Sequence, residues 1–156
     1  MLTISQRLED PRRADVRLEL PYELRSRTRF RMHLAGGEEV RVLLPRGQIL
    51  RGGDRLLAGD GRVVEVAAAA ETVSIAHGED VRLLARAAYH LGNRHTALQI
   101  GQGWLRYRHD HVLDHMLQGL GLRVTVERAP FEPETGAYTA ARTSGDGDGN
   151  IDGHEH

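Results

Sequence analysis

The stretch TVSIAHGEDVRLLARAAYHLGN, residues 72–93, changes its hydrophobic period halfway along and decides the fold. Thr72–Ala76 has the composition of a β-strand. From Val81 to Leu91 the apolar residues recur at helical spacing, with Glu79-Asp80 before them and Gly92-Asn93 after them, as at the start and end of a helix. We therefore expect a strand followed by an amphipathic helix.

The residues up to 127 continue this alternation. Strands are predicted at 97–100 and 104–108, around the turn Gly101-Gln102-Gly103. A second helix follows, because Leu113, Met116, Leu117 and Leu120 repeat at i, i+3, i+4 and i+7, with Asp110 placed to cap the helix and Gly121 to end it. A last strand is predicted at 122–127. The order βαββαβ is the ferredoxin-like plan.

The first 69 residues have a different hydrophobic pattern. Apolar residues alternate with polar ones near Leu2–Ile4 and Val16–Leu20, and again in residues 24–32 and 40–44, while Gly and Pro pairs mark turns. The four alanines at 67–70 read as a short linker. We thus predict an α+β protein with an all-β domain at 1–69, a ferredoxin-like domain at 70–138 and a flexible tail at 139–156.

The predicted strand at 24–32 carries arginines at alternate positions, which puts Arg25, Arg27, Arg29 and Arg31 on one face. A solvated strand face and a docking surface for an acidic protein partner both account for this stripe. RNA binding is disfavoured, because no aromatic side chains are interleaved along the face for base stacking.

Composition excludes several classes of function. The 156 residues have a formal net charge of -1, which argues against broad nucleic-acid or membrane-surface binding. The absence of cysteine excludes disulfides, thiolate metal sites and thiol nucleophiles, and the absence of lysine excludes Schiff-base and P-loop chemistry. With no apolar signal core and no run of membrane-spanning length, we expect a cytoplasmic protein.

The histidines are the strongest functional signal. Seven of nine lie at or beyond position 90, namely His90, His95, His109, His111, His115, His154 and His156. Imidazole binds zinc, copper, iron or nickel at neutral pH, and a site without thiols can also release the metal. We therefore expect a protein that carries a metal and does not use it for turnover.

The βαββαβ plan predicts where these histidines meet. The first helix and the third strand end at the same edge of the sheet, which brings His90, His95, His109 and His111 together there. A turn centred on Gln102 would also place His95 directly across from His109, with Cβ atoms about 5 Å apart.

Other histidines have simpler interpretations. His90 fits a cation or cap at a helix C-terminus, His115 a solvated helix residue, and His33 and His77 structural or surface positions. His111 and His115 are an i, i+4 pair, but the intervening residues lack the glutamate base of an HExxH protease. In the tail, residues 148–153 begin like an EF-hand loop that the chain cannot complete. An auxiliary site with His154 and His156 is the better interpretation.

Several segments resemble one family. AYHLGNRH at 88–95, LQI at 98–100 and residues 105–117 resemble the signature of the urease accessory nickel metallochaperones, UreE. Residues 130–134 and 136–138 extend the resemblance, as do 44–47 and 53–54 in the first half. The likeness therefore covers nearly the whole chain, although the tail has only two histidines and His115 stands where a carboxylate is usual.

The resemblance implies specific roles. His95 matches the family's central metal-binding histidine, which meets its twin at a homodimer interface, and His109 and His111 match a pair linked to additional metal binding. Family members have a peptide-binding-like β domain and a ferredoxin-like metal domain. They deliver nickel to a GTPase-containing assembly that activates the urease apoprotein.

We thus predict a non-enzymatic Ni²⁺ chaperone, with Zn²⁺ and Cu²⁺ as competing metals. Because only neutral imidazole binds a metal, nickel binding should weaken as the pH falls through about 6.5. The alternatives are a metal-dependent phosphohydrolase that uses His109-Asp110-His111 and an RNA-binding assembly factor.

Overall fold

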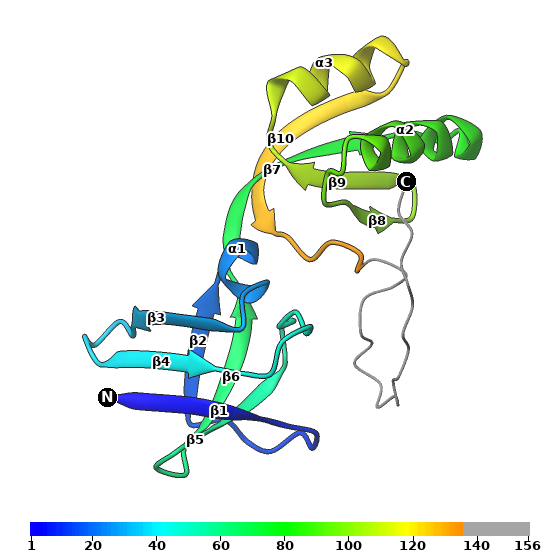
Figure 1. Cartoon of the computed structure of the whole chain (residues 1–156). Helices are drawn as coiled ribbons and strands as arrows, with labels where there is room; N and C mark the ends of the chain where they lie inside the picture. The colour runs from blue at the N-terminus through cyan, green and yellow to red at the C-terminus, as the bar shows by residue number, and fades with distance from the viewer. Residues whose placement is uncertain (136–156) are drawn as a thin grey trace. The chain divides into compact units, whose positions relative to one another are not determined.

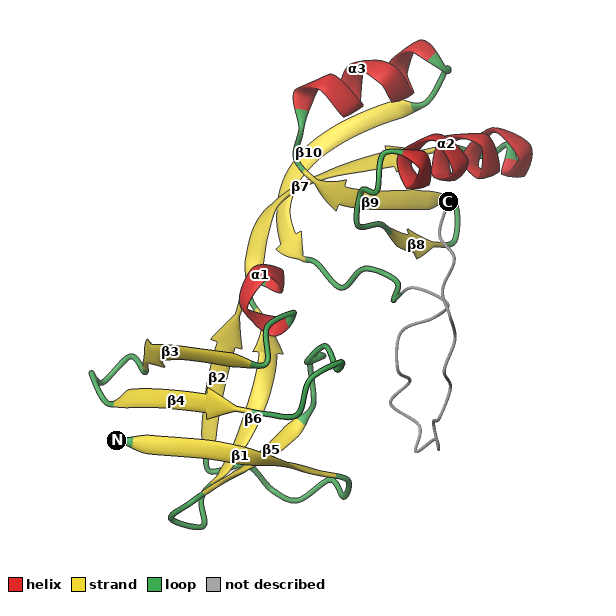
Figure 2. Ribbon diagram, in the orientation of Figure 1, coloured by secondary structure: helices red, strands yellow, loops and turns green. Residues whose placement is uncertain are grey.

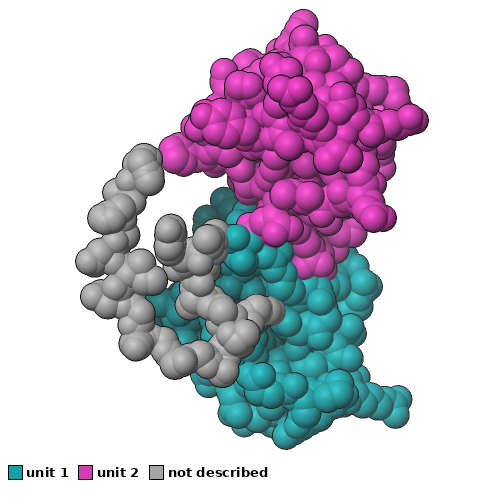
Figure 3. All heavy atoms as spheres, turned by 90° about the vertical axis from the view of Figure 1, so that its right-hand side faces the viewer, with its two compact units in different colours: residues 1–67, 135–156 teal, residues 68–134 magenta. Residues whose placement is uncertain are grey.

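The structure is a computed structural model that describes residues 1–135. Within the described part, the chain divides into two compact units, which are residues 1–67 with residue 135, and residues 68–134 (Figure 3). Each has its own hydrophobic core. Within residues 1–135, no helix is both long and apolar enough to span a membrane.

Unit 1 is a six-stranded sheet with one short helix (Figure 1). Its elements are β1 (Leu2–Leu8), β2 (Val16–Leu20), α1 (Tyr22–Arg25), β3 (Arg29–His33), β4 (Glu39–Leu43), β5 (Arg55–Ala58) and β6 (Val63–Ala68). The strand order is β2-β6-β5-β1-β4-β3, with β1 and β4 parallel. Alternate apolar residues of these strands, such as Ile4, Val42 and Leu56, are fully buried and form the core, as the period-2 pattern predicts.

The predicted strand at 24–32 is wrong in its first half. Pro21 lies at the N-cap of α1, and the strand begins only at Arg29. Arg25 is therefore no member of an exposed stripe: its side chain is fully buried, and its guanidinium donates to the carbonyl oxygens of Leu20, at 3.0 Å, and Leu50, at 3.3 Å. Period-2 alternation cannot distinguish a strand from a single helical turn followed by a strand.

The burial of Arg25 leads to a prediction about stability. Arg25→Ala leaves buried carbonyl groups without their donor and opens a cavity, so the free energy of unfolding should fall by about 3 kcal/mol. The matched variant Arg27→Ala removes an exposed arginine paired with Glu23 and should change it by less than about 0.5 kcal/mol. Urea denaturation of both variants measures the difference, and equal effects would contradict the structural role of Arg25.

Unit 2 has the predicted βαββαβ order (Figure 2). Its elements are β7 (Ala70–His77), α2 (Val81–Asn93), β8 (Gln99–Gly101), β9 (Trp104–Arg108), α3 (His111–Gly119) and β10 (Arg123–Pro130). The strand order β10-β7-β9-β8, with neighbouring strands antiparallel, is the ferredoxin-like arrangement. The α+β fold class is thereby confirmed.

The two helices of unit 2 begin where the sequence predicts. The Asp80 side chain accepts from the backbone N–H groups of Arg82 and Leu83, and Asp110 accepts in the same way from Val112 and Leu113. Both helices pack their apolar faces on the sheet. Their buried apolar residues are Ala87, Leu91, Leu113 and Leu117, in one cluster with Leu105 and Tyr107 of β9.

The four alanines at 67–70 join the two units, as predicted, because the boundary lies between Ala67 and Ala68, but most of the run is strand and not loop. Ala67 and Ala68 end β6, and Ala70 begins β7. Alanine is depleted in strands, so composition indicated a loop, but hydrogen bonding to neighbouring strands overrides this weak preference.

The segment after β10 folds back along the sheet of unit 2. Phe131 is fully buried, the Glu132 N–H donates to Gln99 Oε1 at 3.0 Å, and the Glu134 N–H donates to the Leu98 carbonyl at 2.8 Å. The root of the C-terminal tail is therefore held beside Leu98, three residues after His95.

Candidate metal centre

His95 follows α2 in an unusual backbone conformation. Its φ is 57°, and it is the only non-glycine residue of the described chain with a positive φ. The N–H of His95 donates to Gly92 O at 2.9 Å, and that of Thr96 donates to Leu91 O at 3.1 Å. This pair of bonds is a Schellman motif, in which His95 occupies the left-handed position that glycine usually takes.

The predicted helix end at Gly92-Asn93 is therefore wrong by two residues. Gly92 and Asn93 are helical, and Arg94 is the C-cap. His95 is exposed, and its imidazole has no hydrogen-bond or ion-pair partner within residues 1–135. A left-handed backbone costs an L-residue about 1–2 kcal/mol. The imidazole of His95 is thus exposed at the end of α2 in a backbone conformation that costs free energy.

The predicted pairing of His95 with His109 is also wrong. Gln99 lies opposite Arg106, and Gly101 lies opposite Trp104, so the turn is centred between Gln102 and Gly103. In addition, β8 begins only at Gln99, which leaves His95 in the loop before the strand. The wider prediction, that His90, His95, His109 and His111 share one edge of the sheet, does not depend on this pairing. Within residues 1–135, no three His, Asp or Glu side chains lie close enough together to hold a metal ion.

His109 is held by buried polar groups from two other elements. Its Nδ1 lies 3.0 Å from Ser74 Oγ of β7 and 3.3 Å from Asp114 Oδ2 of α3. The other carboxylate oxygen, Asp114 Oδ1, accepts a 2.7 Å hydrogen bond from the Tyr107 hydroxyl. Ser74 and Tyr107 are fully buried, whereas the His109 side chain is 38% exposed.

This network holds the Nδ1 edge of His109 against Ser74 and Asp114 and favours one tautomer of its imidazole. Burial, and then the hydrogen bond to Asp114, raise the pKa of Tyr107 far above its ordinary value, so its hydroxyl stays a donor. The Asp114 carboxylate accepts hydrogen bonds and therefore favours a proton on His109 Nδ1. Nε2 is then left with a free lone pair, as in the carboxylate–histidine pairs that orient metal-binding imidazoles.

Ser74, His109 and Asp114 do not form a hydrolase triad. A triad places the serine and the carboxylate on opposite nitrogens of the imidazole, whereas here both lie at Nδ1. Ser74 is also fully buried, so no substrate carbonyl can reach its hydroxyl. This constellation can orient an imidazole but cannot activate a serine.

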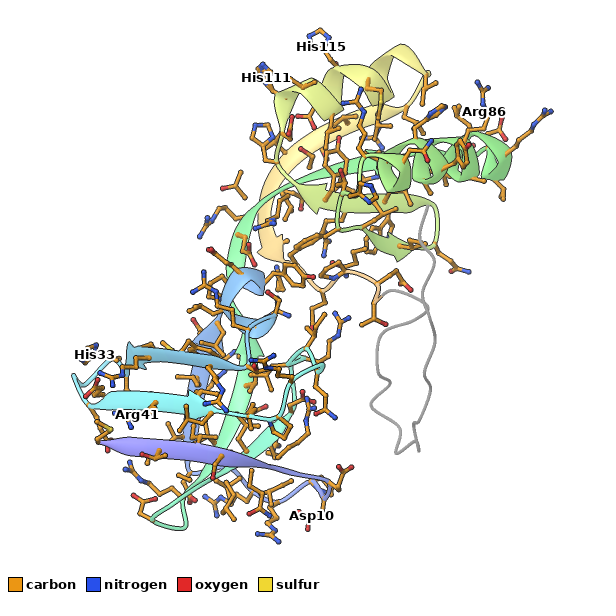
Figure 4. All side chains as sticks on the ribbon, viewed as in Figure 1. Asp10, His33, Arg41, Arg86, His111 and His115 are labelled. Atoms are coloured by element: carbon orange, nitrogen blue, oxygen red, sulfur yellow. The ribbon has the colours of Figure 1, made fainter. Side chains whose placement is uncertain are left out.

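The remaining histidines lie as single surface or structural groups. His111 and His115 project from the exposed face of α3 (Figure 4), opposite Leu113 and Leu117, as their spacing predicts. His90, in the last turn of α2, makes an edge-on contact with the Tyr89 ring. His77 is structural, because its Nε2 lies 3.2 Å from Thr125 Oγ1. His33 is exposed on β3, and the predicted tail ligands His154 and His156 lie outside the described residues.

Sequence reasoning missed the groups that hold His109. Asp114 lies between His111 and His115, and the sequence analysis assigned no role to it. One signal was available: Asp114 lies next to Leu113 and three residues before Leu117, on the buried face of α3, where an acidic side chain requires a partner. The partners Ser74 and Tyr107 lie 40 and 7 residues away, and only strand pairing brings them there.

A β unit followed by an antiparallel βαββαβ unit with solvent-facing imidazoles defines a two-unit α+β protein of the ferredoxin-like class. Sequence profiles identify it further. Residues 3–69 match the N-terminal domain of the UreE urease accessory protein, and residues 70–156 match its C-terminal domain. The chain belongs to the UreE family of urease accessory proteins.

Individual relatives agree with the profiles. The chain is 61% identical over 138 residues to the urease accessory protein UreE of Alkalilimnicola ehrlichii, which covers 88% of this chain and 85% of that protein. It is 49% identical over 157 residues to UreE of Citrobacter koseri, which covers both chains completely. UreE of Pseudomonas putida is 50% identical over 144 residues, which cover 90% of this chain and 87% of the relative.

Proposed function

We propose that this member of the urease accessory family is a nickel metallochaperone, and that His95 is its central ligand. The observation that carries the proposal is the exposed, partner-free imidazole of His95 on a left-handed backbone. An ordinary helix end would have glycine there. A histidine that costs conformational energy and has no hydrogen-bond or ion-pair partner in the described residues is better explained by a ligand than by the fold.

One imidazole cannot hold nickel tightly, so we propose that two copies of the chain share the ion on a two-fold axis near His95. The surroundings support this. The three-residue β8 begins four residues after His95 and lies at the edge of its sheet, and its Ile100 is 51% exposed. An exposed apolar residue on a short edge strand is suited to contact with a second copy.

Further ligands come from two sources in this proposal. His109, with its tautomer favoured by Asp114, and the exposed His111 form an additional metal-binding pair. His154 and His156 are auxiliary ligands of the tail 139–156. The bond from Glu134 N–H to Leu98 O supports their access, because it starts the tail beside the loop that holds His95, and twenty residues of chain can span up to about 66–72 Å.

A site of two imidazoles leaves positions open on octahedral Ni²⁺, which favours transfer by ligand exchange. We propose that the chain gives its ion to an assembly of the urease accessory GTPase and the urease apoprotein in the cytoplasm, without catalysis of its own. In this scheme residues 1–69 dock partners and residues 70–138 bind metal and dimerise. Zn²⁺ and Cu²⁺ compete for the same imidazoles, so selectivity depends on docking and metal supply.

Delivery can be tested in cells that contain urease and its other accessory proteins but lack this chain. At limiting nickel, supplying the chain should raise urease activity, and supplying His95→Ala should not. Excess nickel in the medium should remove the difference, because it bypasses delivery. Full activation by His95→Ala at limiting nickel would refute the central role of this imidazole.

A further inference from the structure

A positively charged surface lies in unit 1, on the outer face of β3 and β4. In this hairpin Arg31 pairs directly with Arg41, and Arg29 pairs with Leu43. Phe30 and Met32 point to the other side and pack against the core. Arg29, Arg31 and Arg41 therefore share one face of the sheet, which we call the arginine face. His33 and Arg41 are labelled on these two strands in Figure 4.

The arginine face is poorly neutralised by the chain itself. Arg31 has one acidic neighbour, Glu39, at 3.8 Å, in an exposed and therefore weak pair. Within residues 1–135, Arg29 and Arg41 have no ion pair, and the buried Nε of Arg41 has no hydrogen-bond partner. Arg29, Arg31 and Arg41 line a hollow of about 280 Å³ together with Phe30 and Leu43.

Protection of the sheet edge does not account for this arrangement. Because β3 is the last strand of the sheet, charges on it prevent edge-to-edge aggregation, and this explains Arg29 and Arg31. It does not explain Arg41, which lies on the inner strand β4. A like charge directly opposite Arg31 destabilises the hairpin unless an anion lies between the two guanidinium groups.

We propose that the arginine face docks an extended acidic segment of a partner protein, which adds to the sheet beside β3. The open edge of β3 offers backbone groups to an added strand. Carboxylates at alternate residues of that strand would lie on the same face as Arg29 and Arg31, where guanidinium groups bind them in forked pairs.

The partner is a peptide segment and not a nucleic acid. Phe30 is the only aromatic residue that lines the hollow, and its ring points to the other side and packs against the core, so no ring is left for base stacking. The formal net charge of the whole chain is -1, whereas nucleic-acid binding requires a broad positive field. Leu43 gives the hollow an apolar contact that suits the methylene groups of a glutamate side chain.

Fluorescence anisotropy with the full-length protein tests the proposal. The probe is a fluorescein-labelled decapeptide in which glutamate alternates with threonine and valine, beside the same peptide with glutamine for glutamate. We expect the acidic peptide to bind the unaltered chain. The glutamine peptide should bind that chain at least about tenfold more weakly, and so should the acidic peptide bind the double variant Arg31→Gln/Arg41→Gln. The matched control Arg86→Gln removes an exposed arginine of α2 in unit 2 and should change affinity by less than about twofold.

Stability measurements separate docking from a structural role. Arg41→Gln removes the like-charge contact, so the unfolding temperature should stay the same or rise. A clear fall would make Arg41 a structural residue and overturn the proposal. Equal loss of binding to a ten-nucleotide polyuridine in the double variant would also overturn it, because the face would then bind anions in general.

The tail of this chain is itself acidic and is the remaining possible occupant. A full-length variant with Asp146, Asp148 and Asp152 changed to asparagine should bind the acidic peptide as the unaltered chain does. An affinity raised by about fivefold or more would assign the arginine face to the tail, and a partner segment would be excluded.

Discussion

Replacing His95 by glycine is expected to abolish tight nickel binding without loss of stability. The variant removes the proposed shared ligand from both copies, so affinity should fall by at least about 100-fold, beyond the 10- to 100-fold typical of losing an outer-shell partner. At the same time, glycine relieves the left-handed strain at φ 57°, by about 1 kcal/mol, which its greater freedom in the unfolded chain offsets in part. Isothermal titration with Ni²⁺ and urea denaturation measure the two effects.

His95→Ala is the matched control for this prediction. It removes the same imidazole but keeps a Cβ in the left-handed region, so it should lose nickel affinity equally and be less stable than His95→Gly. Because the shared ion joins the two copies, sedimentation with and without Ni²⁺ should show metal-dependent association in the unaltered chain only. Retention of the tightest nickel site by either variant would contradict the shared-ligand proposal.

The second large effect is expected at Asp114, a residue outside the proposed ligand set. Asp114→Asn keeps the size of the side chain but replaces the carboxylate that favours a proton on His109 Nδ1. We expect the affinity of the additional metal site at His109 to fall by about 10- to 100-fold, while the tight site at His95 is unchanged. Metal titration resolves the two sites by stoichiometry.

A second measurement distinguishes positioning from simple loss of stability. In the unaltered protein, ¹⁵N chemical shifts should show the His109 proton on Nδ1, and in Asp114→Asn they should show a mixture with Nε2. In a His109→Ala background, Asp114→Asn should cause no further loss of metal affinity, because the two residues act as one unit. Additive losses, or a His109 tautomer that does not respond, would reject the positioning role.

Local sequence patterns were sufficient for much of unit 2. The 3.6-residue spacing from Val81 to Leu91, and again from Leu113 to Leu120, predicted both helices, because one apolar face of each must pack on the sheet. Asp80 and Asp110 predicted their N-termini, since a carboxylate there satisfies free N–H groups. The same patterns failed at residues 24–32, where a single turn of helix precedes the strand and buries Arg25.

For the histidines too, some properties were predicted from the sequence and others were shown only by the tertiary structure. Composition and the predicted strand order singled out His90, His95, His109 and His111 as candidate ligands, because imidazole chemistry can be read from residue type. The resemblance to the UreE family narrowed this group to His95, His109 and His111. Only the tertiary structure showed that His95 takes a left-handed backbone, and that Ser74 and Asp114 orient His109. Residue types and local periods are written along the chain, whereas a backbone conformation at a helix end and a hydrogen bond between separate elements depend on how strands pair and helices pack.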